Sequence, residues 1–349
     1  MSTASSKLAS LSPHLDALVS RAARERAALV MNEVLPLVHP WGFEVRLAAA
    51  DERVDFGGAI AVAGVAHGQL ARLGEDDAEL GRLATHPAWR ALRRFALRWD
   101  DPGGRLAEYV PFIGLEFDVA DEPRAVPEPS VFAMLDWPIE GDPAPAAAPA
   151  ARQGQAAAQE ALRVLLDDAY PAAVAARVDQ CFQVLPRDAR VISVAAMLGR
   201  SVSGVRVFAS VPPADLERYL AELGWPGDTG AVMRVAAEHR RHLTSGVVQF
   251  QVDVGSQVGE RLGMEFSFMR QADAGARWRA LLDQLVAEGL CCATKRAALL
   301  AWPGRSPHPG EDGGDESLAR DISHVKISLH GGVPVEAKAY LSVESKPGA

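Results

Sequence analysis

Cysteine and tyrosine are scarce in this sequence, with three and four of them among 349 residues. Cys181 stands alone and Cys291 adjoins Cys292, a spacing that fits neither a disulfide framework nor a zinc site. Thiols so few and so placed are typical of a reducing compartment, which predicts a cytoplasmic protein. No apolar run approaches the ~20 residues of a membrane span, and the N-terminus lacks the order of a secretory signal.

Positive charge is also in deficit. A net charge of −9 and an isoelectric point of about 5.5 argue against a broad surface for nucleic acid or anionic membrane. Glycine-rich phosphate loops are absent. Each Asp-Asp dipeptide (76–77, 100–101 and 167–168) lacks the second acidic pair of a D-D-x-x-D box. Neither a nucleotide-binding loop nor an Asp-rich metal box is therefore predicted.

What the sequence does contain is a repeated order of helices and strands, read from hydrophobic periodicity. Helices are predicted at 8–37, 77–98, 156–168, 171–185, 213–224, 229–243, 275–289 and 293–301. Strand pairs are predicted at 43–50 with 58–66, within 110–135, at 189–198 with 204–211, at 246–255 with 261–269, and at 323–331 with 335–344. Composition predicts flexible segments at 138–156 and 303–321. The fold class is therefore α+β, one domain over 1–349, with a ten-stranded antiparallel barrel whose closure removes exposed edges.

The predicted strands alternate between an apolar face and a polar face. The residues of the polar face include Glu44, Arg46, Glu116, Asp118, Arg206, Phe208, Gln249, Gln251, Asp253, Glu265, Lys326, His330, Lys338 and Tyr340. If helices cover the apolar face, these side chains line the barrel interior, where unpaired charges are costly. The interior is then either a network of ion pairs or a solvated binding chamber. The alternative is an open sheet whose polar face meets bulk water.

Several short motifs in this order resemble the aromatic prenyltransferases of the ABBA, or PT-barrel, type, especially the fungal indole prenyltransferases of the dimethylallyltryptophan synthase type. FIGLEFDV (112–119), which contains Glu116, is similar to the first acidic strand of that family. VISVAAML and GVRVFASVPP are similar to its third hairpin, and Lys338-Ala339-Tyr340 to its closing strand. Two strands depart from the pattern. Phe132 stands where the family has arginine, and the strand Gln249-Phe250-Gln251-Val252-Asp253 stands where it has further cations.

The resemblance implies transfer of an isoprenoid unit from an allylic diphosphate to an aromatic or peptide acceptor. Glu116 would orient and deprotonate the acceptor, and Arg46, Arg206, Lys326 and Lys338 would hold the diphosphate. The other interior positions, expected to line the chamber and contact the acceptor, are Asp118, Phe132, Phe208, Gln251, Asp253, Glu265, His330 and Tyr340. No cofactor is required in this interpretation and no metal ligands are assigned, although Mg²⁺ remains an option.

Other interpretations stay open at this point. Glu116 could form a structural ion pair with Arg206 or Lys338 and take no part in turnover. The missing cations favour a second hypothesis, in which the barrel is a non-catalytic module that binds or matures a peptide or small molecule. In a third, Asp253 and Glu265 on adjacent strands hold the metal of a hydrolase. His239 and His242, next to two arginines in a helix, are predicted to lie on a solvated basic face.

Overall fold

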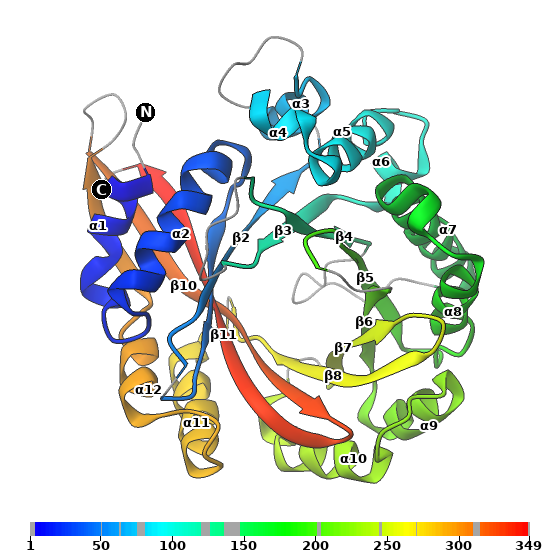
Figure 1. The fold of residues 1–349 in the computed structure, drawn as a ribbon. Helices are drawn as coiled ribbons and strands as arrows, with labels where there is room; N and C mark the ends of the chain where they lie inside the picture. Colours follow the sequence, from blue (N-terminus) through cyan, green and yellow to red (C-terminus); the bar gives the residue numbers. More distant parts are fainter. Residues whose placement is uncertain are drawn as a thin grey trace.

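The structure of the protein is a computed structural model, which describes residues 4–49, 51–62, 64–74, 81–119, 126–135, 147–200, 204–243, 246–269, 271–309 and 315–347. The strands form a ring and the helices lie outside it (Figure 1). The strands are β1 (Trp41–Arg46), β2 (Val54–Ala61), β3 (Phe112–Phe117), β4 (Pro129–Met134), β5 (Arg190–Met197), β6 (Val205–Val211), β7 (Val248–Val254), β8 (Val258–Phe266), β9 (Gly304–Pro309), β10 (Asp315–His330) and β11 (Val333–Pro347). The α-helices are α1 (Ala4–Leu15), α2 (Arg21–Val34), α3 (Val65–Ala71), α4 (Gly81–Thr85), α5 (Pro87–Trp99), α6 (Arg105–Tyr109), α7 (Ala147–Leu166), α8 (Ala172–Gln183), α9 (Pro213–Leu223), α10 (Thr229–Glu238), α11 (Ala274–Ala287) and α12 (Ala293–Leu300). No helix in this described part of the chain is long and apolar enough to cross a lipid bilayer.

The sheet closes on itself because β11 pairs with β10 along one edge and with β1 along the other. The register places Glu44 of β1 opposite Tyr340 of β11, and Lys326 of β10 opposite Lys338. The predicted ten-stranded antiparallel barrel is therefore confirmed, and the open-sheet alternative is wrong. β9 is an additional strand, paired with the first part of β10.

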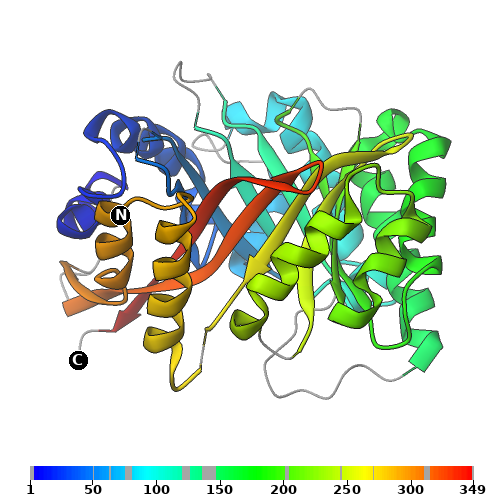
Figure 2. The same cartoon turned by 90° about the horizontal axis from the view of Figure 1, so that it is seen from below.

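The helices lie around the outside of the barrel (Figures 1 and 2). The hydrophobic core fills the layer between them and the strands. α5 shows why this layer forms, since its apolar residues recur at three- and four-residue steps and so share one face. Trp89, Phe95 and Trp99 of that face are fully buried. The indole of Trp89 packs on Phe117 of β3 at 6.1 Å between ring centroids, and its N–H donates to the Pro127 carbonyl at 2.7 Å. Apolar strand residues thus point outward to the helices, which leaves the polar face to the interior.

Three predictions about elements need correction. Residues 303–321 are largely strand, because β9 pairs with β10 and α1 packs against β9, with Ser10 hydrogen-bonded to the buried His308 at 3.1 Å. The second part of 138–156 is helix α7, as its run of alanines favours; residues 138–146 lie outside the described residues. The single helix expected over 8–37 is two helices, because the Ser20 hydroxyl accepts a hydrogen bond from the Ala23 N–H and starts α2.

Candidate functional site

The barrel interior receives the polar side chains that the sequence places on one face of the strands. The strand pairing places polar residues of neighbouring strands directly opposite one another. Glu44 lies opposite Asp55 on β2, Lys326 opposite Glu265 on β8, and Arg206 opposite Asp253 on β7. Along β3, Gly114 and Glu116 lie opposite Phe132 and Ser130 of β4, so Phe132 belongs to the same face. The predicted interior residues therefore share one side of the closed sheet, except His330, whose assignment to the interior is wrong because it lies exposed at the end of β10.

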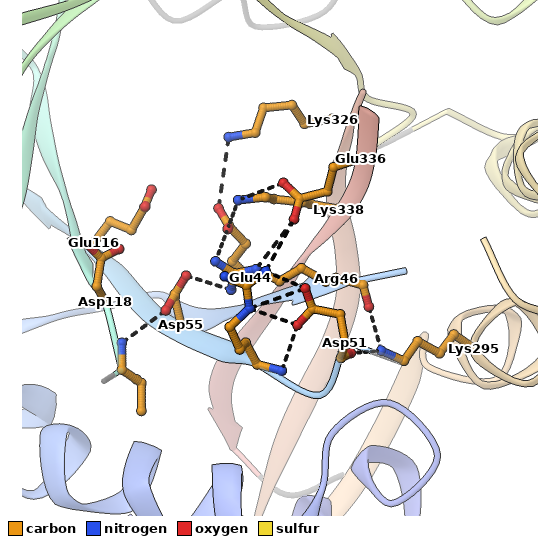
Figure 3. A network of polar contacts seen from close by, with 12 residues as sticks. Glu44, Arg46, Asp51, Asp55, Glu116, Asp118, Lys295, Lys326, Glu336 and Lys338 are labelled. Atoms are coloured by element: carbon orange, nitrogen blue, oxygen red, sulfur yellow. Dashed lines mark hydrogen bonds and ion pairs between the residues drawn. The ribbon is translucent and has the colours of Figure 1, made fainter. Parts of the chain in front are cut away.

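Glu44 is the centre of the larger ion-pair group, which we call the Glu44 network (Figure 3). Lys338 contacts one of its carboxylate oxygens at 2.8 Å, and Lys326 approaches the other at 3.9 Å. Arg46 lies 3.4 Å from Glu44 and 2.6 Å from Asp55. The full network is Glu44, Arg46, Asp55, Lys326, Glu336 and Lys338. Three of the four residues predicted to hold diphosphate therefore converge on one buried carboxylate.

The charges of this network shift the pKa values of its members in opposite directions. Burial opposes the ionisation of Glu44, but the charges of Lys326, Lys338 and Arg46 hold its pKa well below the ordinary value. Burial and the Glu44 charge raise the pKa of Asp55 to about 6, against the pull of Arg46. Burial lowers the pKa of Lys326, although Glu44 opposes that shift. Glu44 is thus the ionised member around which the cations are held.

Tyr340 on β11 lies against this network and is closely packed. Its ring stacks on the His324 ring with 3.9 Å between centroids and 14° between planes, and the Lys326 ammonium lies 4.9 Å from the Tyr340 centroid. Burial raises the pKa of Tyr340 well above its usual range and lowers the pKa of His324 to about 3. His324 is therefore a neutral ring that supports Tyr340, and Tyr340 already provides a cation–π contact for Lys326.

A second ion-pair group contains Glu116, and its cation is a residue that the sequence analysis missed. Arg200, in the connection after β5, donates to Glu116 at 2.7 Å and to Asp118 at 2.6 Å. The structural ion pair considered for Glu116 thus exists, but its partner is neither Arg206 nor Lys338. Arg200 follows Gly199 in the turn after β5, so no periodicity could have assigned it to the interior.

Arg206 is the fourth predicted diphosphate ligand and lies apart from the Glu44 network. Its guanidinium donates to Asp253 on the adjacent strand at 2.7 Å. Burial works against the charge of Arg206, but Asp253 raises the pKa above the ordinary arginine value. Asp253 is therefore committed to Arg206 instead of being free for a metal ion.

Glu265 differs from the other interior carboxylates, because its carboxyl group makes no hydrogen bond or ion pair with any described residue. Burial raises its pKa to about 7, while Lys326 and Arg206 pull in the opposite direction. The side chain thus lies within electrostatic reach of cations from both β10 and β6. A carboxyl group with a pKa near neutrality is suited to exchange a proton at physiological pH.

The interior also has an apolar wall on β4, β5 and β6. Phe132 and Phe208 meet edge to face, with 5.7 Å between ring centroids and 70° between planes. The apolar wall consists of Phe132, Ile192, Ala195, Met197 and Phe208 and is separate from the main core. Beside it, a Cβ on Gly263 would lie only 2.6 Å from the Gln251 amide nitrogen, so glycine is what lets Gln251 and Lys326 share this space. One side of the interior is therefore charged and another is aromatic.

The histidines fall outside this arrangement or at its edge. His330 ends β10 and is exposed, 3.2 Å from Glu260. The prediction of a solvated basic face for His239 and His242 is wrong, because both are buried between α10, α11 and β8. Among the described residues, the groups of three possible metal ligands include neither Asp253 nor Glu265. The metal site of the hydrolase hypothesis thus has no third ligand in this part of the chain.

Comparison with known proteins identifies the fold. No protein-family model and no curated protein matches the chain. Among solved structures, AnaPT from Neosartorya fischeri matches with a TM-score of 0.59 and 13% identity over 98% of this chain and 93% of that one. Prenyltransferase PriB, solved in its apo form, matches with a TM-score of 0.53 and 16% identity over 100% and 99%; it has also been solved with product diphosphate.

A third matching structure contains two bound ligands, DMASPP and Trp. The structure of 6-dimethylallyltryptophan synthase from Micromonospora olivasterospora in complex with DMASPP and Trp has a TM-score of 0.50 and 15% identity, over 96% of this chain and 97% of that one. These neighbours are ABBA aromatic prenyltransferases, and the likeness extends over nearly the whole of each chain. The fold of this chain is therefore the PT barrel.

Proposed function

We propose that the protein transfers an isoprenoid unit from an allylic diphosphate to an aromatic acceptor inside the barrel. The observation that carries this proposal is the division of the interior. The cations of β1, β10 and β11, which are buried or nearly so, lie on one side, and the aromatic wall of β4 to β6 lies on the other, with Arg206 of β6 beside that wall. A diphosphate requires cations, and an allylic carbocation is stabilised by aromatic faces. The interior therefore supplies groups for both the leaving diphosphate and the carbocation.

In the proposed reaction the C–O bond of the allylic diphosphate breaks, and diphosphate leaves with the electron pair. The allylic carbon then forms a bond to the acceptor ring, and the displaced ring proton passes to a carboxylate. Arg46, Arg206, Lys326 and Lys338 are the proposed diphosphate ligands. Glu116 is the proposed partner of the acceptor's N–H or O–H.

The remaining interior residues surround these two groups. Phe132 and Phe208 would hold the isoprenoid chain, and the polar positions that would contact the acceptor are Asp118, Gln251, Asp253 and Tyr340. Glu265 is a further interior carboxyl group, and its pKa of about 7 suits it to take a proton at neutral pH. The neighbours solved with diphosphate, or with DMASPP and Trp, support this choice of donor and an aromatic acceptor.

One observation favours a second function. Arg46, Arg206, Lys326 and Lys338 each already face a carboxylate, and a diphosphate would have to displace these partners. A barrel whose interior charges neutralise one another fits a non-catalytic module that binds a peptide or small molecule. This second function predicts no affinity for an allylic diphosphate.

Calorimetric titration of dimethylallyl diphosphate, with and without Mg²⁺, separates the two functions. The transferase proposal expects binding that weakens by about tenfold or more in Lys338→Ala, because one charge-assisted contact is worth about 1.5–3 kcal/mol. Lys346→Ala, near the end of the same strand and half-exposed, is the matched control and is expected to bind as the unaltered protein does. Absence of binding at millimolar ligand would leave only the binding module.

A further inference from the structure

A separate cluster of possible metal ligands lies outside the barrel, where the C-terminal ends of α10 and α11 meet. Glu238 is the last residue of α10, His239 caps that helix, and Glu288 caps α11. One ligand atom from each of these residues lies within 4.8 Å of the others. The two glutamates reach solvent while His239 is only 1% exposed. The cluster is therefore open on one side and anchored by a buried imidazole on the other.

The hydrogen bonding of His239 defines which nitrogen faces the glutamates. Its Nδ1 lies 3.1 Å from the Val235 carbonyl, which can only accept, so Nδ1 carries the hydrogen. Nε2 is buried, has no hydrogen-bond partner and lies 3.4 Å from a carboxylate oxygen of Glu288. In the neutral ring this places a lone pair against a negative charge. A positive ion between the two atoms removes that repulsion, and donation from the other ring nitrogen to a carbonyl is the usual setting of a metal-binding histidine.

The surroundings favour a cation at the same point. Both helices end here, and each helix C-terminus contributes partial negative charge from its last carbonyls. Gln284 donates to the second carboxylate oxygen of Glu288 at 2.7 Å, which fixes that side chain in place. The guanidinium of the nearby Arg241 donates to Gln284 at 2.9 Å and to His242 at 3.1 Å. Arg241 is therefore bonded to residues that surround the cluster and not to the three proposed ligands.

We propose that His239, Glu238 and Glu288 bind a divalent transition-metal ion of the Zn²⁺ type, with water completing the coordination. An imidazole with two carboxylates suits such ions, whereas Ca²⁺ and Mg²⁺ prefer oxygen ligands throughout. The site is structural and independent of the proposed transfer reaction. The His239 ring packs on Phe266 of β8 at 5.6 Å, and the next residue back along that strand is Glu265. The ion would thus fasten α10 and α11 to the strand that carries Glu265.

The test is calorimetric titration of Zn²⁺ into the full-length protein after treatment with a chelator. We expect one ion per chain, and affinity at least about 100-fold weaker in His239→Gln and in Glu288→Gln, since each removes a ligand. His330→Gln is the matched control, because it removes an exposed histidine that also pairs with a glutamate. It is expected to bind Zn²⁺ as the unaltered protein does.

Thermal unfolding gives a second measurement. Zn²⁺ should raise the midpoint of the unaltered protein and of His330→Gln, and should leave Glu288→Gln unchanged. Glu288 is a helix-end residue that reaches solvent, so this variant is expected to fold even if His239→Gln does not. The proposal is overturned if Zn²⁺ does not bind, if Glu288→Gln binds it undiminished, or if Mg²⁺ binds equally well.

Discussion

Arg200 holds Glu116 at 2.7 Å, and so the acidic residue that first marks the barrel interior is already engaged in an ion pair. The same guanidinium reaches Asp118 from the turn after β5. This relationship limits what Glu116 can do for an acceptor, because one of its carboxylate oxygens already accepts a hydrogen bond from Arg200. Glu116 can serve an acceptor only if its ion pair with Arg200 opens, and Arg200 would then keep Asp118 as its partner.

Replacement of Arg200 tests this coupling first through stability. In Arg200→Ala, two carboxylates that are partly shielded from water lose their cation. We expect the free energy of unfolding to fall by about 1–2 kcal/mol. This loss is smaller than that of a fully buried ion pair, because solvent reaches Asp118 and screens its charge. Urea denaturation measures the change. Arg218→Ala, which removes an exposed pair with Asp215 at 2.9 Å, should cost less than about 0.5 kcal/mol; equal losses in the two variants would contradict the assignment.

Glu265 should make stability depend on pH near neutrality. Its pKa rises from 4.5 in the unfolded chain to about 7 in the folded protein, so folding favours the protonated form. The resulting contribution is complete below pH 4.5 and is lost as the pH rises through about 7. At about 1.4 kcal/mol per pKa unit, and allowing for solvent in the interior, the loss is about 1–2 kcal/mol.

The variant Glu265→Gln isolates this effect. As the pH rises from 5 to 8, the free energy of unfolding of the variant should increase relative to that of the unaltered protein by about the same 1–2 kcal/mol. Asp55, whose pKa is raised to about 6, adds a similar pH dependence that the variant leaves in place. Denaturation curves across this range provide the measurement. A constant difference between the two proteins at every pH would show that Glu265 does not titrate there.

The Glu44 network predicts a non-additive pair of substitutions. Lys338→Met removes the closest cation from Glu44, which is only 4% exposed. We expect the free energy of unfolding to fall by about 2–3 kcal/mol, and no further, because Lys326 and Arg46 still face Glu44. The further change Glu44→Gln removes the unbalanced charge. The double variant should therefore be more stable than the sum of the two single variants predicts, by at least about 1 kcal/mol. Additive losses would mean that Glu44 and Lys338 do not interact in solution.

Phe132 offers a gain-of-affinity test of the transferase proposal. The related strand in the resembling family carries arginine at this place, and Phe132 lies on the interior face beside β3. Phe132→Arg adds a cation to an interior whose existing cations are paired, so the affinity for dimethylallyl diphosphate should rise about tenfold. Phe132→Leu keeps the wall apolar and serves as the control. Calorimetry that finds no gain would argue that diphosphate does not reach this part of the barrel.

The sequence was sufficient to predict the barrel because strand alternation is a local property. Glu116, Lys326 and Lys338 were assigned to the interior from two-residue periodicity alone, and the register confirms each of them. Asp55 was missed because the glycines of β2 weaken its pattern and shifted the predicted strand toward 58–66. Arg200 and His239 were missed or misplaced for another reason: each gets its position from a tertiary contact, with β3 in one case and β8 in the other.

The pairing of β1 with β11 has a consequence for the order of assembly during folding. Residues 41–46 find their partners at 338–343, so the ring cannot close until nearly the whole chain is present. Until then Glu44 has neither Lys326 nor Lys338 beside it, and its charge favours contact with water over burial. Closure of the barrel and neutralisation of its interior are therefore one late event, and we expect it to be slow, because it depends on contacts between opposite ends of the sequence.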